Sequence, residues 1–516
     1  MKIKNFLIII FVIVLAVGAV SCKKILDVPP QGKLTLDQFW LSKDQAIAAI
    51  GGIYSNLGST VSPTTKGLSP LEAFIYWADV RADQLASNSS KLPIGQEAKA
   101  NIDLLLPGPS DITTNYTSLY RIINFANQAI KNIPGIVDKD PAFTIQDMKE
   151  LTGEAYFLRA YAYFWLVRTF RDVPLVLDPS ETDQQDYNIS KSPADTILSQ
   201  IVKDLDVAKT TLPEWYANSQ YPRSRATRYT AETVLADVYL WMAAMSTVPG
   251  NNNALYDKAI ENCDAVINSR KYFLVPGISF GSVFLVGNSD ETIFETYANA
   301  KLNNQVNNLK TWFSTYFLVT TVTDNLFNAY SAPDYRGFTP PPGPTPPAGT
   351  KVSYDGSTRF VLKYNSTTND SRWIFYRYPE ILLMKAEVLA HRYVDDPVQL
   401  GIASDLVNQV RYRAYGVTSF PAVNATTTNQ MDDIILDERG REFLAEGKRW
   451  FDLMRFASRD NYLHKEYLID RVLNSFTGVN QLIIGPRVND PRSWYLPLNA
   501  DALAANPKLI QNPYYQ

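Results

Sequence analysis

Apolar residues recur at helical spacing over most of the chain that follows Leu34. The clearest segment is residues 150–170, in which apolar side chains fall at alternating steps of four and three along two separate stripes. A helix that carries two apolar stripes is buried on two sides, as in a stacked array of helices. Pro174 closes this segment, because proline cannot continue a helix and restricts the residue before it.

The same spacing returns in segments that follow one another as pairs. It predicts helices over residues 230–245 and 256–267, then over 379–391 and 403–413, and finally over the long segment 431–456. Recurring helix pairs with small residues at close-contact positions resemble tetratricopeptide units, although no strict period of about 34 residues survives. A generic helical bundle is the alternative. The predicted fold class is mainly α: an irregular tetratricopeptide-like helical-repeat array with a few short strands.

Between the helix pairs lie segments of another character. Residues 272–300 alternate weakly between apolar and polar, residues 360–364 form a short β-like run, and residues 339–349 are rich in proline. The proline-rich stretch is typical of an exposed, semi-rigid loop rather than of a linker between domains. We therefore expect one domain over residues 34–516, with a loop-rich inserted subdomain at about residues 272–375.

The N-terminus has the pattern of an export signal. Two lysines precede an apolar run over residues 6–20, which is shorter than the about 20 residues of a membrane-spanning helix. The small residues that follow end at Cys22, and this box resembles a bacterial lipobox, in which the chain is cut before a cysteine that is then acylated. We expect residues 1–21 to be removed, Cys22 to carry the lipid anchor and residues 22–33 to form a short spacer. The alternative is an ordinary signal peptide with an incidental cysteine.

Composition and charge exclude several classes of function. The net charge of −3 becomes −5 once residues 1–21, which hold two lysines and no acid, are removed. This mild acidity gives no electrostatic footprint for nucleic acid. The second cysteine of the chain, Cys263, has no partner once Cys22 is acylated, so neither disulfides nor cysteine-ligated metals are expected. Aromatic residues make up 12% of the chain, which suggests dense helix packing or a ligand surface made of rings.

Three acidic residues, Glu438, Glu442 and Glu446, recur at steps of four along a predicted helix. A pair of carboxylates can hydrolyse a glycosidic bond, but these acids have cationic neighbours that lower the pKa, whereas a general acid needs a raised pKa. We predict that they brace the helix. The two histidines, His391 and His464, have no second ligand at metal-binding spacing, and no phosphate-binding or nucleophile motif is present. We expect a protein that is not an enzyme and has no cofactor or metal.

Several motifs occur in order across nearly the whole chain and resemble those of one family. They are CKKILD at 22–27, EAYFLRAYAYF at 154–164 followed by FRDVPL at 170–175, RYPEILLMKAE at 377–387, ERGRE at 438–442 with EGKRWFDL at 446–453, YLPL at 495–498 and QNP at 511–513. Each motif alone is weak, and their order makes them specific. Together they resemble the SusD/RagB family of outer-membrane nutrient-binding lipoproteins.

The resemblance implies a lipoprotein of the outer membrane that faces the cell exterior. In such a protein the helical domain is the lid of a SusC-like TonB-dependent barrel, and the lid captures a glycan, or sometimes a peptide, that the barrel imports. Surface-exposed members usually carry acids soon after the acylated cysteine. Here Lys23 and Lys24 come first and Asp27 is the earliest acid.

Candidate ligand contacts are aromatic rings in loop-like segments with polar neighbours. Sugar rings stack their C–H faces on aromatic rings, while their hydroxyls need amides, carboxylates or guanidinium groups. Two segments have this composition, and the resemblance favours the first because family members often use that region for ligands. The expected residues are Trp77, Asp79, Arg81 and Asp83 in the first segment, and Trp312 and Tyr316 in the second, which follows the amide-rich stretch 303–308. Core packing is the alternative for each ring.

Two other functions stay open beside glycan capture. The same lid architecture could take up a peptide or another nutrient, in which case an unpaired backbone edge or a deep pocket is expected instead of an arc of rings. The chain could also be a structural accessory subunit that stabilises its barrel without a ligand of its own. That role predicts large apolar patches and no organised aromatic site.

Overall fold

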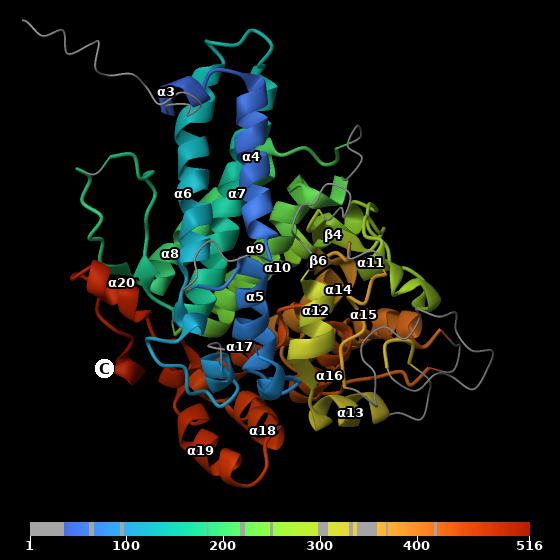
Figure 1. Ribbon diagram of the computed structural model, residues 1–516. Helices are drawn as coiled ribbons and strands as arrows, with labels where there is room; N and C mark the ends of the chain where they lie inside the picture. Colours follow the sequence, from blue (N-terminus) through green and yellow to red (C-terminus); the bar gives the residue numbers. More distant parts are fainter. Residues whose placement is uncertain are drawn as a thin grey trace, which may run out of the picture.

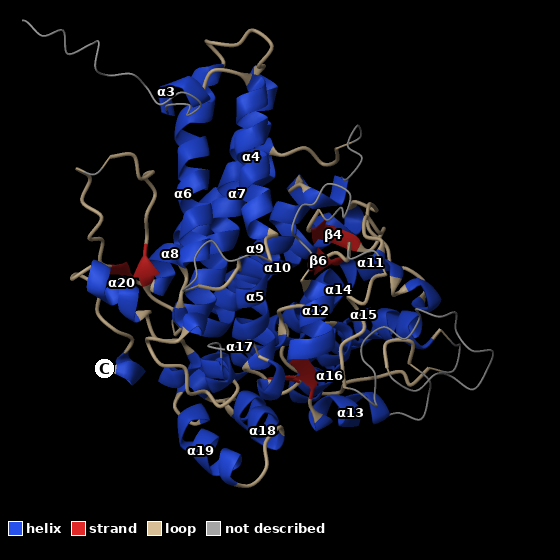
Figure 2. Ribbon diagram, viewed as in Figure 1, coloured by secondary structure: helices blue, strands red, loops and turns tan. Residues whose placement is uncertain are grey.

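The computed structural model describes most of the chain, and helices dominate it (Figures 1 and 2). The described residues are 36–60, 67–92, 97–182, 184–216, 222–247, 251–297, 308–329, 334–337, 359–367, 370–416 and 420–516. The predictions for Cys22, for residues 1–33 and for the proline-rich loop at 339–349 lie outside these residues. No helix among the described residues has both the length and the apolarity needed to cross a membrane.

Helix packing follows the order of the chain, which confirms the tetratricopeptide-like array. From α6 to α10 each helix packs on its neighbours in sequence, so that α7 lies between α6 and α8, and α9 lies between α8 and α10. The helix α10 also packs against α14, which extends the array to a further pair, α14 and α15. In Figure 1 the long helices α4, α6 and α7 stand side by side. The bounds are α4 Lys43–Leu57, α6 Thr117–Asn132, α7 Ile145–Phe170, α8 Ala194–Thr211, α9 Arg228–Met245, α10 Asn251–Asn268, α14 Tyr378–Arg392 and α15 Pro397–Tyr415.

The helix α7 is buried on two sides along its C-terminal two thirds, as its two apolar stripes predict. It begins with a capping box, in which the Thr144 hydroxyl accepts from the N–H of Asp147 at 3.1 Å and the Asp147 carboxylate accepts from the N–H of Thr144 at 3.0 Å. In its middle, Arg159 donates to Asp204 on α8 at 2.7 and 2.8 Å and to Asn127 on α6 at 2.9 Å. This buried arginine therefore fixes three neighbouring helices to one another.

The segment predicted as one helix over residues 431–456 is two helices. The helix α16 (Thr428–Glu442) ends at Glu442, and α17 (Arg449–Tyr462) starts seven residues later. Between them Ala445 and Gly447 take left-handed φ angles of 63° and 72°. Such angles break a right-handed helix and are cheap at glycine. Glu446 consequently lies in the turn and not on the helix face that carries Glu438 and Glu442.

The strands are short and pair antiparallel in three two-stranded sheets among the described residues. The pairs are β1 (Leu85–Ser87) with β5 (Phe317–Val319), β2 (Val173–Pro174) with β3 (Lys191–Ser192), and β4 (Thr292–Glu295) with β6 (Ile374–Arg377). Of the β-like run 360–364, Phe360 and Val361 form bridges and no longer strand, and the partner of Phe360 is Leu318. The pairing of β4 with β6 brings residues 292–295, inside the loop-rich stretch, beside residues 374–377 at its end. The bounds of the domain and of this insertion remain predictions.

Shorter elements complete the described chain. The α-helices are α3 Leu36–Phe39, α5 Pro70–Phe74, α11 Ser282–Leu285, α12 Leu309–Thr311, α13 Thr321–Asn328, α18 Glu466–Asn474, α19 Val479–Val488 and α20 Ala500–Ala505. Two π-helices, η1 Ile75–Val80 and η9 Trp312–Tyr316, lie at the segments predicted to bind ligand. Short 3₁₀ turns are η2 Ser89–Lys91, η3 Glu97–Ile102, η4 Ile112–Thr114, η5 Ile133–Ile136, η6 Pro222–Ser224, η7 Gly277–Ser279, η10 Pro491–Trp494 and η11 Pro513–Tyr515.

Candidate ligand-binding site

The first predicted segment is not a loop that presents rings to solvent. Residues 75–80 form the π-helix η1, a continuation of α5, and every side chain of η1 is buried. Trp77 is wholly buried, its indole N–H donates to the carbonyl of Thr113 at 2.6 Å, and its ring meets that of Phe170 edge-on at 5.3 Å. The expectation of an accessible Trp77 is therefore wrong, because α5 continues into the core instead of ending at the surface.

The polar residues of this segment are buried as well, and each contacts the turn or the helix that follows α16. Asp79 accepts from the backbone N–H of Gly447 at 2.7 Å and of Lys448 at 3.3 Å. Burial raises the pKa of Asp79 to about 7 although these hydrogen bonds lower it. Asp83 accepts two hydrogen bonds of 2.7 Å from Arg449. This arrangement clamps η1 to the start of α17.

Arg81 completes the same clamp. Its guanidinium lies 4.1 Å from the centre of the Trp450 ring and donates to the carbonyl of Trp494 at 2.8 Å. Burial lowers the pKa of Arg81 to about 9. In this structure none of Trp77, Asp79, Arg81 and Asp83 reaches the surface, so the geometry assigns all four to the core.

The second predicted segment is only partly buried. Trp312 is 6% exposed and belongs to the hydrophobic core, whereas Tyr316, at the end of η9, is half-buried. Its neighbours Ser314 and Thr315 are also half-buried, and Thr311 is exposed. Within this segment, Tyr316 is the ring that remains available to a ligand.

The structure brings the two segments together although about 230 residues of chain separate them. Ser87 of β1 pairs with Phe317 of β5, and the next residue, Asn88, extends the contact into η9. The Asn88 N–H donates to the carbonyl of Tyr316 at 2.7 Å, and its side-chain amide donates to the carbonyl of Thr315 at 3.1 Å. Asn88 thus fixes the backbone on which the Tyr316 side chain is mounted.

Around Tyr316 the exposed and half-buried side chains are mostly hydroxyls and amides. We define the β1–β5 surface as the exposed and half-buried polar residues of these two segments, together with Asp103, which bonds to Ser87: Ser87, Asn88, Ser90, Lys91, Asp103, Asn308, Lys310, Thr311, Ser314, Thr315 and Tyr316. Asp103 accepts from the N–H and the hydroxyl of Ser87 at 3.0 and 3.1 Å, and desolvation raises the pKa of Asp103 to about 8. A face with one ring among amides and hydroxyls can stack one sugar ring and bond its hydroxyls.

Deeper in the molecule, the three glutamates predicted to brace a helix form a buried charge network. Glu442 accepts from Arg336 at 2.6 Å and also from Arg377 and Arg413. Burial by itself raises the pKa of Glu442, but the three guanidinium groups outweigh it and hold this pKa well below its usual range. A carboxylate in this state cannot act as a general acid.

The two other glutamates of the network are ionised for the same reason. Arg336 and Arg411 lower the pKa of Glu438, and Arg377 lowers that of Glu446, in each case against the opposing effect of burial. The structural prediction for these acids is confirmed. Arg441, which lies 3.8 Å from Glu438, also lowers the pKa of that acid. The other principal cations come from other segments and not from the neighbouring positions 439, 448 and 449.

The histidines pair with acids. His391 lies 2.7 Å from Asp432, and His464 lies 3.1 Å from Asp460. Across the part of the chain that the structure describes, no three histidine, cysteine, aspartate or glutamate side chains are grouped so that they could hold a metal ion.

Comparison with known proteins identifies the family. Residues 358–515 match the family model described as the SusD family, and residues 59–240 match a second model described as starch-binding associating with outer membrane. Together these matches include α6, α7, α8, α14 and α15 of the helical array, both sides of the clamp and both C-terminal motifs. The chain belongs to the SusD/RagB family.

Relatives of the SusD/RagB family cover nearly the whole chain. The SusD-like protein P2 of Formosa agariphila is 26% identical over 539 residues, which cover 97% of this chain and 98% of that protein. The SusD-like protein P38 of the same organism is 26% identical over 501 residues, covering 88% of this chain and 92% of the relative.

Solved structures show the same fold. A SusD homologue from Bacteroides thetaiotaomicron matches with a TM-score of 0.72 at 16% identity, covering 93% of this chain and 98% of that chain. A SusD superfamily protein from Parabacteroides distasonis matches with a TM-score of 0.69 at 20% identity, covering 94% and 100%. These likenesses confirm the mainly α architecture of a SusD-like chain.

Sequence reasoning missed the residues that organise the β1–β5 surface. Neither Asn88 and Ser90 nor Asp103 stands in a pattern that indicates a binding surface. The one feature that could have marked the surface is the aromatic and hydroxyl-rich run 311–317, which the sequence did single out.

Proposed function

We propose that this SusD-like chain is a cell-surface lipoprotein that captures a glycan for import, as the lid of a SusC-like TonB-dependent barrel in the outer membrane. The β1–β5 surface is the place of first contact with the ligand. One observation carries this proposal: the pairing of β1 with β5 mounts Tyr316 among amides and hydroxyls, at a segment singled out for its rings.

Family membership supports the same function. One of the two matching models is described as starch-binding associating with outer membrane, and a solved structure with this fold, at 19% identity, is titled a putative sugar binding protein from Bacteroides vulgatus. The buried charge network supports a binding role over catalysis, because its glutamates are held ionised and out of reach of solvent.

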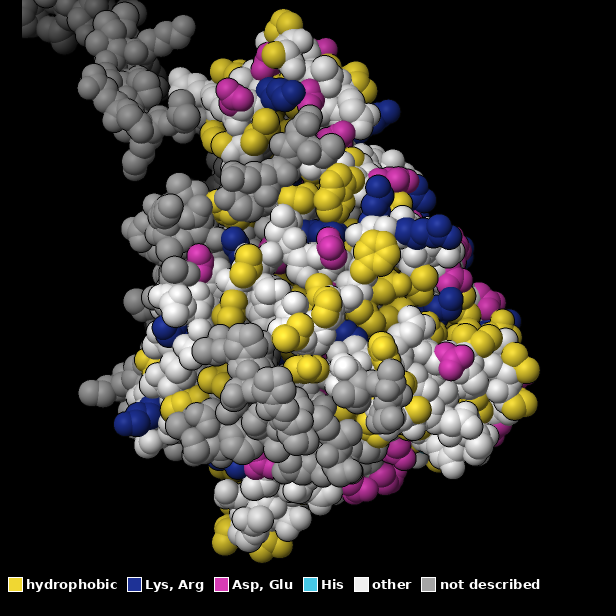
Figure 3. All heavy atoms as spheres, turned by 90° about the vertical axis from the view of Figure 1, so that its right-hand side faces the viewer, with side chains coloured by type: hydrophobic (Ala, Val, Ile, Leu, Met, Phe, Trp, Pro, Cys, Tyr) yellow, Lys and Arg dark blue, Asp and Glu magenta, His cyan; other side chains and the backbone are white. Residues whose placement is uncertain are grey.

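A protein-contact face is also needed for a lid. Over the coloured part of the face in Figure 3, hydrophobic side chains form patches between charged side chains of both signs. Exposed apolar side chains on the stretch before β4 include Phe273, Ile278 and Val286. Such a face is suited to packing against a partner protein.

The test of glycan capture is an affinity-gel screen of residues 23–516 against polysaccharides, with the Tyr316→Ala variant beside the wild type. Removing the ring is expected to weaken retention by one polysaccharide about tenfold, the equivalent of about 1.4 kcal/mol. Tyr412→Ala is the matched control, because Tyr412 is 51% exposed on α15, outside the β1–β5 surface.

The variants also separate the two predicted segments. Trp77→Phe should leave retention unchanged, since Trp77 is buried beneath the surface. Retention that survives Tyr316→Ala but is lost in Trp77→Phe would contradict the placement of the site. Absence of retention by every polysaccharide would favour capture of a peptide, or a structural subunit without its own ligand.

The partnership with a barrel needs its own measurement. The lipidated chain, purified from outer membranes in mild detergent, should bring a large β-barrel protein with it in equimolar amount. Surface proteolysis of intact cells should cut the chain if it faces the exterior. Recovery of the chain without a barrel protein would contradict the proposal that it acts as a lid.

A further inference from the structure

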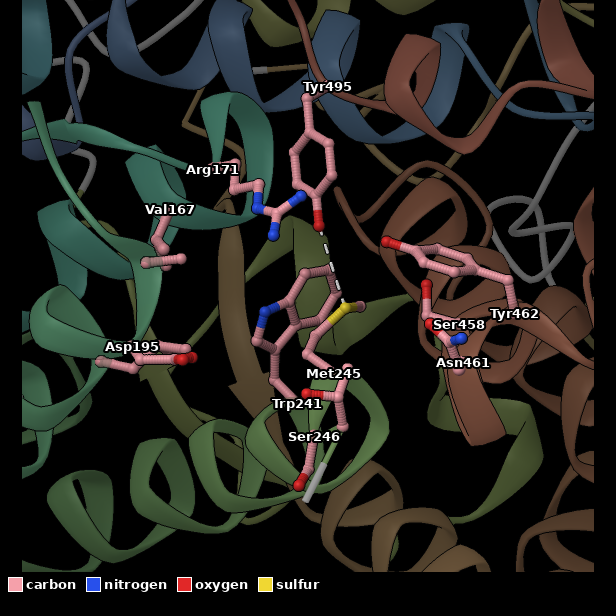
Figure 4. A pocket seen from close by; sticks show the side chains of 13 residues that line it. Val167, Arg171, Asp195, Trp241, Met245, Ser246, Ser458, Asn461, Tyr462 and Tyr495 are labelled. Atoms are coloured by element: carbon pink, nitrogen blue, oxygen red, sulfur yellow. Dashed lines mark hydrogen bonds between the residues drawn. The ribbon is translucent and has the colours of Figure 1, made fainter. Parts of the chain in front are cut away.

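A pocket lies among the ends of the helical array, and it shares no residue with the β1–β5 surface. It has a volume of about 200 Å³ and is shown in Figure 4. Arg171 at the end of α7, Trp241 and Met245 on α9, Ser458 and Tyr462 on α17, and Tyr495 after η10 contribute to its wall. In Figure 4, Arg171 and Tyr495 face Tyr462 and Ser458 across Met245 and Trp241.

The floor of this pocket is aromatic and apolar. Trp241 is 2% exposed and Tyr495 is 7% exposed. The Tyr495 hydroxyl lies 3.8 Å from the sulfur of Met245, a weak contact, and also interacts with the side chain of Tyr462 across the pocket. Rings and a thioether form the kind of surface on which the C–H face of a saturated ring packs.

One buried hydroxyl in the wall, that of Ser458, is left without a hydrogen-bond partner by the described residues. Ser458 is 3% exposed, and its Oγ makes no hydrogen bond with any of the residues that the structure describes. Buried polar groups are satisfied in the great majority of proteins, and an unsatisfied one is costly. Because Ser458 lines a cavity large enough for a ligand, a ligand hydroxyl is a natural partner for it.

The rim of the pocket is polar and carries both signs of charge. Asn461 and Asp195 are exposed at the opening, and the Arg171 side chain is 59% exposed, with Asp172 4.0 Å away. The two charged residues that line the pocket, Arg171 and Asp195, have opposite signs, so the lining has no net charge that would favour a charged ligand. Amide, guanidinium and carboxylate groups are the partners that the hydroxyls of a neutral sugar require.

Backbone strain is concentrated at the same rim. Asp460, Asn461 and Tyr462 all take left-handed φ angles, of 52°, 57° and 65°, and Arg171 across the pocket has φ 65°. Three consecutive non-glycine residues in this conformation are costly, and strain of this kind is stored at functional sites. Here it turns the end of α17 so that Asn461 and Tyr462 line the opening.

We propose that this pocket binds one neutral sugar ring. An apolar cavity of about 150 Å³ holds a benzene-sized molecule, whereas drug-sized ligands need about 300–1,000 Å³. A volume of about 200 Å³ therefore fits a six-membered ring with its hydroxyls and not a longer chain. The ring packs on Trp241 and Tyr495, and its hydroxyls bond to Ser458, Asn461 and Arg171. This inference does not depend on glycan capture at the β1–β5 surface, since the two sites share no residue.

The test uses the mature lipidated chain in a detergent without a sugar headgroup. Saturation-transfer NMR measures the binding of glucose, galactose, mannose and xylose, each offered separately at millimolar concentration. At least one of them should bind saturably. Ser458→Ala and Asn461→Gly should each weaken this binding about threefold to tenfold, the effect of one lost hydrogen bond.

Asn461→Gly tolerates the left-handed backbone and so keeps the fold, which makes it decisive if Ser458→Ala is unstable. Asn288→Gly is the matched control, because Asn288 also has a left-handed φ, of 53°, and does not line the pocket. Binding that is unchanged in both pocket variants overturns the proposal, as does the failure of all four sugars to bind. Polysaccharide retention by the β1–β5 surface should be unaffected by either pocket variant, so failure of one site is distinguishable from failure of the other.

Discussion

Replacing Glu442 by glutamine tests whether the buried charge network holds the fold together. Glu442 is fully buried and accepts from three arginines, Arg336, Arg377 and Arg413. Glutamine keeps the shape but removes the negative charge, and its NH₂ group faces guanidinium donors where an acceptor is required. Three cations then share fewer anions inside the protein.

The expected cost follows from the burial of these groups. Removing one partner of a buried ion pair costs about 3–5 kcal/mol, because the remaining charge is left uncompensated. A folded domain is stable by only about 5–15 kcal/mol, so this loss is a large share of the total. The matched control is Glu261→Gln, since Glu261 pairs with Lys258 on an exposed face where both side chains are more than half exposed. That exposed pair is worth at most about 0.5 kcal/mol.

Urea unfolding of residues 23–516 measures the free energy of unfolding of both variants. The pH dependence adds a second check, because the folded pKa of Glu442 lies well below the ordinary value of 4.5. Its stabilising effect is therefore fully present above pH 4.5 and is lost only as the pH falls toward the folded pKa. The difference between wild type and Glu442→Gln should stay constant from pH 7 to pH 5 and shrink at lower pH.

Coupling to an arginine distinguishes the network from a packing effect. In the double variant Glu442→Gln/Arg413→Gln the two losses in free energy of unfolding should not add. The loss should be smaller than the sum of the two single losses by about 0.5–3 kcal/mol. The reasoning would be refuted if Glu442→Gln and Glu261→Gln lowered the free energy of unfolding by amounts that agree within about 1 kcal/mol. Additive losses in the double variant would refute it as well.

Three further predictions concern single groups. Trp77→Phe should lower the free energy of unfolding by about 1–3 kcal/mol, measured by urea unfolding, because the carbonyl of Thr113 loses its buried donor. Burial raises the pKa of Glu295 to about 7, so the folded chain holds a proton that the unfolded chain has released between pH 4.5 and 7. Wild-type stability should therefore fall as the pH rises from 5 to 8. In thermal unfolding, the stability of Glu295→Gln should depend less steeply on pH, and a pH dependence as steep as that of the wild type would contradict the prediction. Cys22→Ala should move the protein from the membrane fraction to the soluble fraction on immunoblots, and an unchanged distribution would argue against the lipid anchor.

Helices with a strong local pattern could be predicted from the sequence. The ranges expected around α7, α9, α10 and α14 agree with the structure to within a few residues at most ends, since hydrophobic periodicity and caps act within one or two turns. The merged segment 431–456 shows the limit of this reasoning. Its apolar spacing continues across the break, whereas the backbone leaves the helix after Glu442 and turns at Ala445 and Gly447 with left-handed φ angles.

The candidate site could be predicted only in part. Rings, acids and an arginine at 76–84 have the composition of a sugar site, but the partners that bury them are far away in sequence. Asp83 meets Arg449 across 366 positions, and Asp79 meets Gly447 across 368. No local pattern reports such contacts, so composition alone could not tell a clamp from a binding surface.

The clamp and the β1–β5 surface are nevertheless parts of one arrangement. Asp83, held by Arg449, lies two residues before β1, and its carbonyl accepts from the hydroxyl of Thr320, which follows β5. The next carbonyl, that of Gln84, accepts from Thr323 at 3.1 Å. Both strands are therefore fixed to the core at the end opposite Asn88 and Tyr316. A binding surface carried on such a frame keeps its geometry when the loops beyond it change. This explains why the residues that looked most like a sugar site are buried: they hold the strands beside which the half-buried ring of Tyr316 is presented.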